Sequence, residues 1–353
     1  WYDDDLQGYN TIAEIPGTAF SIATGKFDNL LADGLAVPDW DNNQVLLYHY
    51  NGDKTFSNTG TIQTPYPPTQ VKFFDLDHDA HLDLIVGLYA SALQIWWGDG
   101  AGGFPTNTLL NIPGEVQAIE IGNDNFFQEP QVFLTIKEAD LLPDYSFMAY
   151  IADDNGRENV EVVLIKKPGT NVPDTIYYVM DDMAIANIDA ESNDEIVALT
   201  VGIPSPVYIF NDTTVSGNHL PYSTHYKYVF GNTYSYTPSS ISINDFDGDG
   251  DNDILTTGYS WDELVLIENL GNYVFADEEI IARQTRGFVV IDYENDGDND
   301  IVTVNERLEE NGITVYLNNG LGNFTVRENC YFPYADGRPW SIIASDFNLD
   351  GKT

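Results

Sequence analysis

Aspartates occupy one nine-residue stretch of this chain at a spacing that suits a metal ion. In Asp245-Phe-Asp247-Gly-Asp249-Gly-Asp251-Asn-Asp253, carboxylates stand at positions 1, 3, 5 and 9, and glycine stands at position 6. Converging carboxylate oxygens are the hard ligands that Ca²⁺ prefers, and without a cation they would repel one another. The flanks, Ser242-Ile243 and Ile254-Leu255-Thr256-Thr257, are short β-type segments. The stretch therefore predicts a calcium-binding turn of a β-hairpin, because a helical EF-hand would need helices on both sides.

The same register recurs along the sequence. Complete copies run from Asp75 to Asp83 and from Asp292 to Asp300, and each leads into an apolar run. One weaker copy keeps oxygen ligands, two are eroded, and the last reaches the end of the sequence before its ninth position. The first positions of all copies fall at residues 26, 75, 122, 187, 245, 292 and 346, so the repeats are 47 to 65 residues long. This period is typical of β-propeller blades and not of helical solenoids.

Oxygen-bearing residues at the odd positions of five copies form the expected metal-ligand set. They are Asp75, Asp77, Asp79, His81 and Asp83; Asn187, Asp189, Glu191, Asn193 and Glu195; Asp245, Asp247, Asp249, Asp251 and Asp253; Asp292, Glu294, Asp296, Asp298 and Asp300; and Asp346, Asn348 and Asp350. His81 would offer only its main-chain carbonyl. We expect three strong Ca²⁺ sites and up to two more, with a structural role, because such loops leave little room for a substrate. In the first copy, the ammonium group of Lys26 could stand where an ion sits elsewhere.

Each repeat carries the same flanking pattern. An apolar run leads into the loop, a second follows it, a third often ends in a glycine and asparagine turn, and a fourth precedes a proline or glycine turn. Four short strands would make one blade, and the blades would start near residues 20, 70, 116, 182, 240, 287 and 340 of a single domain spanning 1–353. Longer repeats contain segments at about 137–180 and 211–230, which we interpret as insertions that carry partner contacts.

These loops and their period resemble the FG-GAP or VCBS repeat propellers, which include the integrin α-subunit propellers. The resemblance implies an all-β fold, a seven-bladed β-propeller of four-stranded antiparallel blades. It also implies Ca²⁺ in the hairpin loops between the first and second strands of some blades, and ligands on the opposite face.

The N-terminal segment reads like the end of a blade. Asn10-Thr-Ile-Ala-Glu-Ile-Pro-Gly17 matches Asn107-Thr-Leu-Leu-Asn-Ile-Pro-Gly114, which is in register with a fourth strand and the turn after it. We therefore expect the N-terminal strand to close the last blade, which removes two exposed sheet edges. Because residue 353 falls inside the seventh loop, the last blade is incomplete in this sequence, and we expect a longer parent chain.

Composition indicates the surroundings of the protein. The formal net charge of −42 opposes binding to nucleic acid and to anionic membranes. Cys330 is the single cysteine, so no disulfide can form within the chain, and no apolar run approaches the roughly 20 residues that span a bilayer. With metal ions stabilising its loops, such a chain is expected outside the cell or at the cell surface, without insertion into the membrane.

Aromatic and basic residues fall on the connections at the predicted metal-free face. Flat rings beside charged groups suit a carbohydrate or a peptide. The candidate ligand-binding residues are Trp40, Tyr66, Tyr89, Tyr236, Trp261, Arg286 and Arg338.

Three functions fit this pattern. We expect a recognition or adhesion module that binds a glycan or a protein ligand on the face opposite the calcium loops. One alternative is a structural subunit of a cell-surface assembly or filament, including assembly of identical chains. The other is a propeller-type polysaccharide lyase, in which Tyr236 and Arg286 could act on a uronate. Since no nucleophile elbow, zinc helix or nucleotide-binding loop occurs, we expect no enzyme activity and no catalytic residues.

Overall fold

The computed structural model describes most of the chain. The described residues are 2–3, 8–9, 17–28, 32–52, 55–123, 130–138, 146–153, 157, 160–165, 175–176, 179–189, 194–201, 206–212, 222–229, 238–258, 263–271, 273–305, 312–331 and 341–347. Their regular secondary structure is β-strand throughout, which confirms the expected all-β class. This part of the chain contains no helix long and apolar enough to cross a lipid bilayer.

The strands form six antiparallel sheets of four or five strands, each built from consecutive segments of the chain, and one short hairpin. The hairpin is β1 (Tyr2–Asp3) and β2 (Gly8–Tyr9). The first three sheets are β3 (Ala23–Gly25), β4 (Gly34–Asp39), β5 (Gln44–Tyr50) and β6 (Phe56–Gln63); β7 (Pro68–Phe74), β8 (Asp83–Leu88), β9 (Ala92–Trp97) and β10 (Thr106–Asn111); and β11 (Gly114–Asn123), β12 (Pro130–Glu138), β13 (Ser146–Asp153), β14 (Val160–Leu164) and β15 (Thr175–Ile176). The other three are β16 (Val179–Ala186), β17 (Glu195–Val201), β18 (Pro206–Asp212) and β19 (Tyr222–Val229); β20 (Pro238–Asn244), β21 (Asp253–Gly258), β22 (Glu263–Ile267) and β23 (Glu279–Arg283); and β24 (Thr285–Ile291), β25 (Asp300–Asn305), β26 (Gly312–Asn318) and β27 (Phe324–Tyr331).

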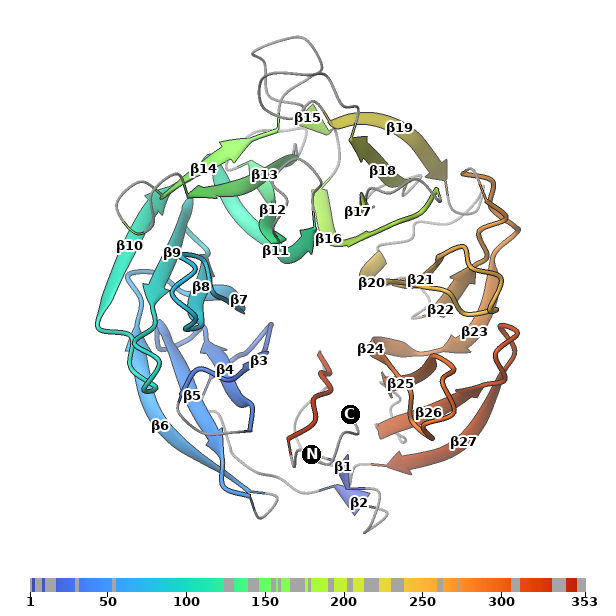
Figure 1. Ribbon diagram of the computed structural model, residues 1–353, viewed down its shortest axis with the longest axis horizontal. Helices are drawn as coiled ribbons and strands as arrows, with labels where there is room; N and C mark the ends of the chain where they lie inside the picture. Colours follow the sequence, from blue (N-terminus) through green and yellow to red (C-terminus); the bar gives the residue numbers. More distant parts are fainter. Residues whose placement is uncertain are drawn as a thin grey trace.

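The sheets stand side by side around a common centre, as in a β-propeller (Figure 1). The first strand of each sheet, β3, β7, β11, β16, β20 or β24, faces the centre, and the last strand lies outside. Consecutive strands of a sheet are antiparallel, so the loops after the first and third strands lie at one end of the ring and the other connections lie at the opposite end. We call these the loop end and the opposite end.

The hydrophobic core lies between neighbouring sheets. One cluster of buried side chains joins the second and third sheets, with Trp97 and Ile95 on one side and Leu134 and Val132 on the other. Corresponding clusters join each of the other consecutive pairs of sheets. Middle strands such as β8 are buried along their whole length because both of their faces are covered, which explains their near-continuous apolar sequence. Core packing thus fixes each blade against the next.

Segment 341–347 lies between the last sheet and the first. Ile343 and Phe347 pack against the face of the first sheet that contains Leu35, Tyr48 and Phe56. Other residues of this segment line the same cavity as β24. In Figure 1 the segment stands in the gap between the β24–β27 sheet and the β3–β6 sheet, close to β1 and β2. The predicted closing strand, residues 10–16, lies outside the described residues, as do 340 and 348–353.

The two predicted insertions contain strands of the sheets. Residues 137–180 include β13, β14 and β15, and residues 211–230 include β19. The interpretation of these segments as insertions was therefore wrong. The cause is that these strands lack the loop register that marks the first half of each repeat, so the sequence does not reveal them.

Candidate metal loops and the opposite end

Three groups of aspartates form candidate metal sites at the loop end. The groups are Asp75, Asp77 and Asp83; Asp245, Asp247 and Asp253; and Asp292, Asp296 and Asp300. Within each group, one oxygen from each carboxylate lies within 4.8 Å of the others. Each group spans the connection between the first and second strands of its sheet, which is where the sequence predicts it. Hard carboxylate oxygens gathered this closely fit Ca²⁺.

The loops turn back on themselves through left-handed backbone at two positions. Position 4 has positive φ at Gly248, Asn295 and His78, and position 6 has positive φ at Gly250 (96°), Gly297 (94°) and Ala80 (69°). Glycine adopts this conformation without steric cost, whereas alanine does so at a cost of roughly 1–2 kcal/mol. The loop sequence therefore prefers glycine or asparagine at position 4 as well as glycine at position 6.

The carboxylate at position 1 organises the turn. Asp75 accepts hydrogen bonds from the main-chain N–H groups of Asp79 at 3.0 Å and Ala80 at 2.9 Å. Asp292 accepts the two corresponding bonds. Asp245 accepts from Gly248 at 2.7 Å and Gly250 at 3.0 Å. These bonds hold the loop in place by side-chain contacts to its own backbone.

The carboxylate at position 9 connects the loop to its sheet by hydrogen bonds. Asp253 is buried, and its two oxygens accept the N–H groups of Phe246 at 3.0 Å and Asn269 at 2.8 Å. Asp83 and Asp300 make the same pair of bonds. Burial raises the pKa of Asp83 and of Asp253 to about 6, since these backbone bonds only partly offset the loss of water. Burial also raises the pKa of Asp300. A bound cation would favour the ionised form.

Hydrogen bonds connect the loop of one sheet with that of the next. Asn252, at position 8, donates its side-chain amide to the carbonyl of Asn187 at 2.7 Å, and Asn299 donates to Asp245 at 3.1 Å. Buried Asn318 adds a bond of 2.8 Å to the carbonyl of Phe246. These bonds therefore connect the loops of the fourth, fifth and sixth sheets.

An arginine enters the loop of the second sheet. Arg157, which precedes β14 in the third sheet, contacts Asp77 through Nε and Asp79 through Nη2 at 2.7 Å. Its guanidinium carbon lies 5.4 Å from the centre of the Trp97 ring. Arg157 could not be predicted from the sequence, because no pattern near it in the chain marks its approach to residues 75–83.

The weaker copies are described in part. Glu195 accepts the N–H of Ile188 at 2.7 Å, as the position 9 aspartates do in their loops, and Asp189 accepts the hydroxyl of Tyr273 at 2.7 Å. Asp346 lies in segment 341–347. The remaining predicted ligands, Glu191, Asn193, Asn348 and Asp350, lie outside the described residues. Lys26 is exposed and makes no ion pair with the part of the chain that the structure describes, so nothing supports its proposed role as an internal cation.

Aromatic side chains gather at the opposite end. The rings of Trp40, in the β4–β5 connection, and Tyr89, in the β8–β9 connection, lie 4.7 Å apart between centroids at an interplanar angle of 71°. Phe20 packs edge-on against Trp40 at 5.4 Å. Tyr66 lies close to Tyr89, since the N–H of Tyr89 donates to the carbonyl of the adjacent Pro67 at 2.9 Å. We call Phe20, Trp40, Tyr66 and Tyr89 the aromatic patch.

The patch is unusually exposed for large apolar side chains. Phe20, Tyr66 and Tyr89 are 44%, 45% and 56% exposed. Acidic groups border it: Asp41 accepts two bonds from Thr18, and buried Asp39 accepts the side-chain amides of Asn42 and Gln44. The structure thus brings together three of the seven predicted ligand-binding residues.

The other candidates are not part of this patch. Arg286 lies on β24, at a bulge in the pairing of β24 with β25. Bulges occur near the start of four more inner strands, at residues 69, 117, 181 and 239. Tyr236, Trp261 and Arg338 lie outside the described residues.

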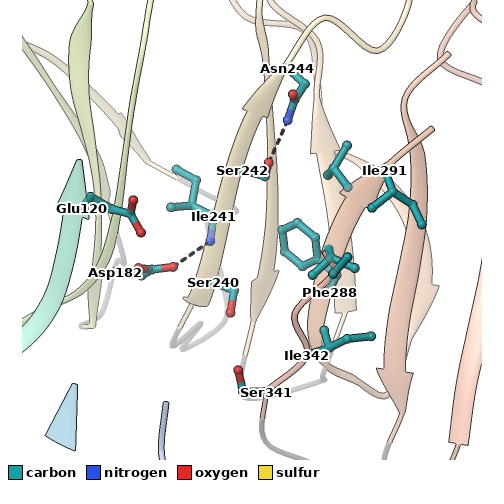
Figure 2. Close-up of a pocket in the computed structure, with 13 residues that line it drawn as sticks. Glu120, Asp182, Ser240, Ile241, Ser242, Asn244, Phe288, Ile291, Ser341 and Ile342 are labelled. Atoms are coloured by element: carbon teal, nitrogen blue, oxygen red, sulfur yellow. Dashed lines mark hydrogen bonds between the residues drawn. The ribbon is translucent and has the colours of Figure 1, made fainter. Parts of the chain in front are cut away.

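A cavity of about 480 Å³ lies among the inner strands (Figure 2). Glu120 of β11, Asp182 of β16, and Ser240 and Ser242 of β20 line it together with β24 and segment 341–347. Asp182 accepts the N–H of Ile241 at 3.0 Å, and Lys72 donates to both oxygens of Glu120 at 3.0 Å. Burial, and then the charge of Glu120, raise the pKa of Asp182 to about 8. In the sequence, the signal for this cavity is the presence of charged residues such as Glu120 and Asp182 within otherwise apolar strands.

Solved structures with low sequence identity share the fold. A protein from Lactobacillus plantarum aligns with a TM-score of 0.58 at 12% identity, covering 94% of this chain and 91% of its own. Sqt1 of Saccharomyces cerevisiae aligns with a TM-score of 0.53 at 11% sequence identity, covering 90% of this chain and 75% of its own. An Agrocybe aegerita lectin that recognises non-reducing terminal N-acetylglucosamine aligns with a TM-score of 0.50 at 13% sequence identity, covering 87% of this chain and 79% of its own. No curated protein matches this chain.

The family comparison identifies the repeats themselves. The FG-GAP-like repeat matches residues 22–86, 245–303 and 292–353. The first two matches contain the three complete carboxylate loops, and the third begins at Asp292 and continues to the end of the sequence. With the fold and loops described above, these matches identify the chain as a member of the FG-GAP repeat family.

Proposed function

We propose that this protein is an extracellular, calcium-stabilised recognition module whose aromatic patch binds a glycan. Calcium would hold the loop end, and the ligand would bind at the opposite end. The observation that carries the ligand-binding half of the proposal is the contact between Trp40 and Tyr89 within an exposed patch.

The chemistry of the loops supports Ca²⁺ as the bound ion. The donors are carboxylates, and the three groups contain neither a thiol nor an imidazole. One oxygen of Asp77, Oδ1, is buried and has no hydrogen-bond partner among the described residues, as expected for an atom that serves a cation. Residues at positions 1, 3, 5 and 9 would hold the ion, and the ion would supply charge neutralisation that holds the hairpin closed.

A seventh blade would complete the ring. Segment 341–347 occupies the sector between the sixth and first sheets and packs against the first through Ile343 and Phe347. This is the place of an inner strand, and Phe347 stands at position 2 of its copy, as buried Phe27, Leu76 and Phe246 do in theirs. We therefore propose seven blades, with the N-terminal segment as the closing strand.

The aromatic patch supports a sugar as the ligand. Rings offer flat apolar faces for stacking against the C–H face of a pyranose, and neighbouring acidic and amide groups accept and donate bonds to its hydroxyls. The Agrocybe aegerita lectin with a similar fold recognises non-reducing terminal N-acetylglucosamine, which supports a sugar as the ligand. An external location fits the family and the net charge of −42.

A glycan array followed by fluorescence titration tests the proposal. The parent protein in calcium should bind a defined glycan, and Tyr89→Ala should weaken that binding about tenfold, which corresponds to about 1.4 kcal/mol. Leu321→Ala is the matched control, because Leu321 is 67% exposed but belongs to the loop end. Equal affinities for Tyr89→Ala and the parent protein would contradict the assignment. A parent protein that binds no glycan in calcium would favour a protein ligand or a structural role instead.

A further inference from the structure

The loop at residues 75–83 differs from its two counterparts because a guanidinium group contacts a buried carboxylate in it. Arg157 reaches it from the neighbouring sheet and contacts Asp77 at position 3 and Asp79 at position 5. Nη2 also lies 3.4 Å from the carbonyl oxygen of Gly98. This fork of donors engages two carboxylates that a calcium ion would otherwise bind.

The partner of Arg157 is buried, which sets this contact apart from a surface ion pair. The side chain of Asp77 is only 7% exposed. At the 292–300 loop, Arg327 also contacts the residue at position 3, Glu294, but at 3.3 Å with both side chains around 40% exposed. Exposed pairs contribute little, whereas a buried carboxylate depends on its partner. Within the described part of the chain, no arginine or lysine pairs with the 245–253 loop.

Asp77 has unused capacity for a cation. Its Oδ2 contacts Arg157, but buried Oδ1 has no hydrogen-bond partner in the described structure. The loop thus combines the carboxylate cluster Asp75, Asp77 and Asp83 with an incompletely satisfied ligand atom. A guanidinium group and Ca²⁺ cannot both occupy positions 3 and 5.

The sequence of this loop also departs from the other two. Position 6 is Ala80 in place of glycine, and position 8 is Leu82 in place of the asparagine that links loops elsewhere. Both changes make the turn less favourable for metal binding, independently of Arg157.

We infer that Arg157 is an intramolecular competitor for the metal site of the 75–83 loop. This loop therefore binds Ca²⁺ more weakly than the loops at 245–253 and 292–300, and the ion enters it by displacing the guanidinium group from Asp77 and Asp79. The inference rests on the proposed calcium binding and adds to it the order in which the three loops bind Ca²⁺.

Calcium titration of three proteins tests this order. Calorimetry and equilibrium dialysis would be run on the parent chain, on Arg157→Gln and on the matched control Arg327→Gln, which makes the same exchange at the exposed pair. We expect the parent to bind ions at the two other complete loops before the 75–83 loop. Arg157→Gln should raise the affinity of the 75–83 loop for Ca²⁺ about tenfold or more, and Arg327→Gln should leave that affinity unchanged.

Tryptophan fluorescence reports the same step without counting ions. Because Arg157 lies over Trp97, its displacement should change emission in the last phase of the calcium titration of the parent. Arg157→Gln should lack that phase. To assign the phase, Asp75→Asn combined with Arg157→Gln should abolish the gained site.

The outcomes separate the inference from the proposed function. Calcium binding of the parent with three equal affinities, unaltered by Arg157→Gln, would overturn the competition while leaving calcium binding intact. Absence of calcium binding in all proteins, including Arg157→Gln, would overturn both.

Discussion

The side-chain amide of Asn299 lies 3.1 Å from the carbonyl oxygen of Asp245 and joins the metal loops of two neighbouring sheets. Asn252 makes the same bond one sheet earlier, to Asn187. Both asparagines stand at position 8, where the side chain points out of its own loop and toward the preceding one. The loops of these three sheets are therefore held partly by one another, so a change in one of them should affect the next.

Asn299→Ala should lower the free energy of unfolding by about 1–2 kcal/mol, because it removes a bond and leaves a carbonyl without its partner. It should also weaken calcium binding at the 245–253 loop. Urea denaturation and calcium titration measure the two effects. Asn323→Ala is the control, since Asn323 is exposed and its amide donates to the carbonyl of Leu321 in its own turn. Equal stability of the two variants would show that the link between loops contributes nothing.

Backbone conformation at position 6 predicts opposite effects for reciprocal exchanges. Gly250→Ala should destabilise the protein by about 1–2 kcal/mol, because φ is 96° there. An added Cβ would have no atom within 4 Å, so the cost would come from the backbone conformation and not from a steric clash. Ala80→Gly should stabilise it, by up to about 1 kcal/mol, as the strain at φ 69° exceeds the entropy that glycine adds to the unfolded chain. Chemical denaturation in calcium-free buffer measures both. A stabilising Gly250→Ala would refute the argument.

Removing carboxylates from one loop should have opposite consequences with and without metal. Burial, and then the charges of Asp249 and Asp245, raise the pKa of Asp247. Asp247→Asn with Asp249→Asn should abolish one calcium site and lower the melting temperature in calcium by several degrees. In chelator the same variant should melt at or slightly above the parent.

Thermal melts in calcium and in EDTA test this sign change. Asp277→Asn, which changes a residue outside the metal groups, controls for a general loss of negative charge. If the double variant melts like the parent in calcium, the 245–253 loop is not a stabilising calcium site.

Stability without metal should fall as pH rises. Burial raises the pKa of Asp83 and Asp253 to about 6 and that of Asp182 to about 8, against an unfolded value near 3.9. Between about pH 4 and 8 the folded state therefore binds more protons than the unfolded state, and the free energy of unfolding decreases with rising pH. Calcium should reverse this trend at the loops, since it binds the ionised carboxylates.

Urea midpoints at pH 5, 6.5 and 8, in metal-free buffer and in calcium, measure the dependence. We expect the metal-free midpoint to be highest at pH 5 and the gain from calcium to be largest at pH 8. A metal-free midpoint that rises from pH 5 to pH 8 would contradict the raised pKa values.

The loop register could be predicted from sequence because each position has a residue type that follows from its local role. Position 2 is apolar since Phe27, Leu76 and Phe246 are buried, and position 9 is acidic since Asp253 and its counterparts bind two backbone N–H groups. Trp40 and Tyr89 could be predicted at one end of the ring from their place in the repeats. Their mutual contact depends on how neighbouring sheets pack.

Features created by tertiary approach left no such pattern. The inner-strand bulges fall at Thr69, Gln117, Asp181, Ser239 and Arg286, which share no residue type. Arg157 is 80 residues from Asp77 in the chain, so neither residue predicts the contact. Strands β13 and β19 were missed for a related reason, because they belong to the second half of their repeats, where no loop register marks a strand.

The most direct test of the account is the thermal unfolding of the parent protein at neutral pH in calcium and in EDTA, with magnesium as a control for ionic strength. We predict a melting temperature at least 10 °C higher in calcium than in EDTA, as expected when several sites bind only the folded state, and a small effect of magnesium. Coincident unfolding curves in calcium and EDTA would contradict the central claim that calcium holds the carboxylate loops of this propeller together.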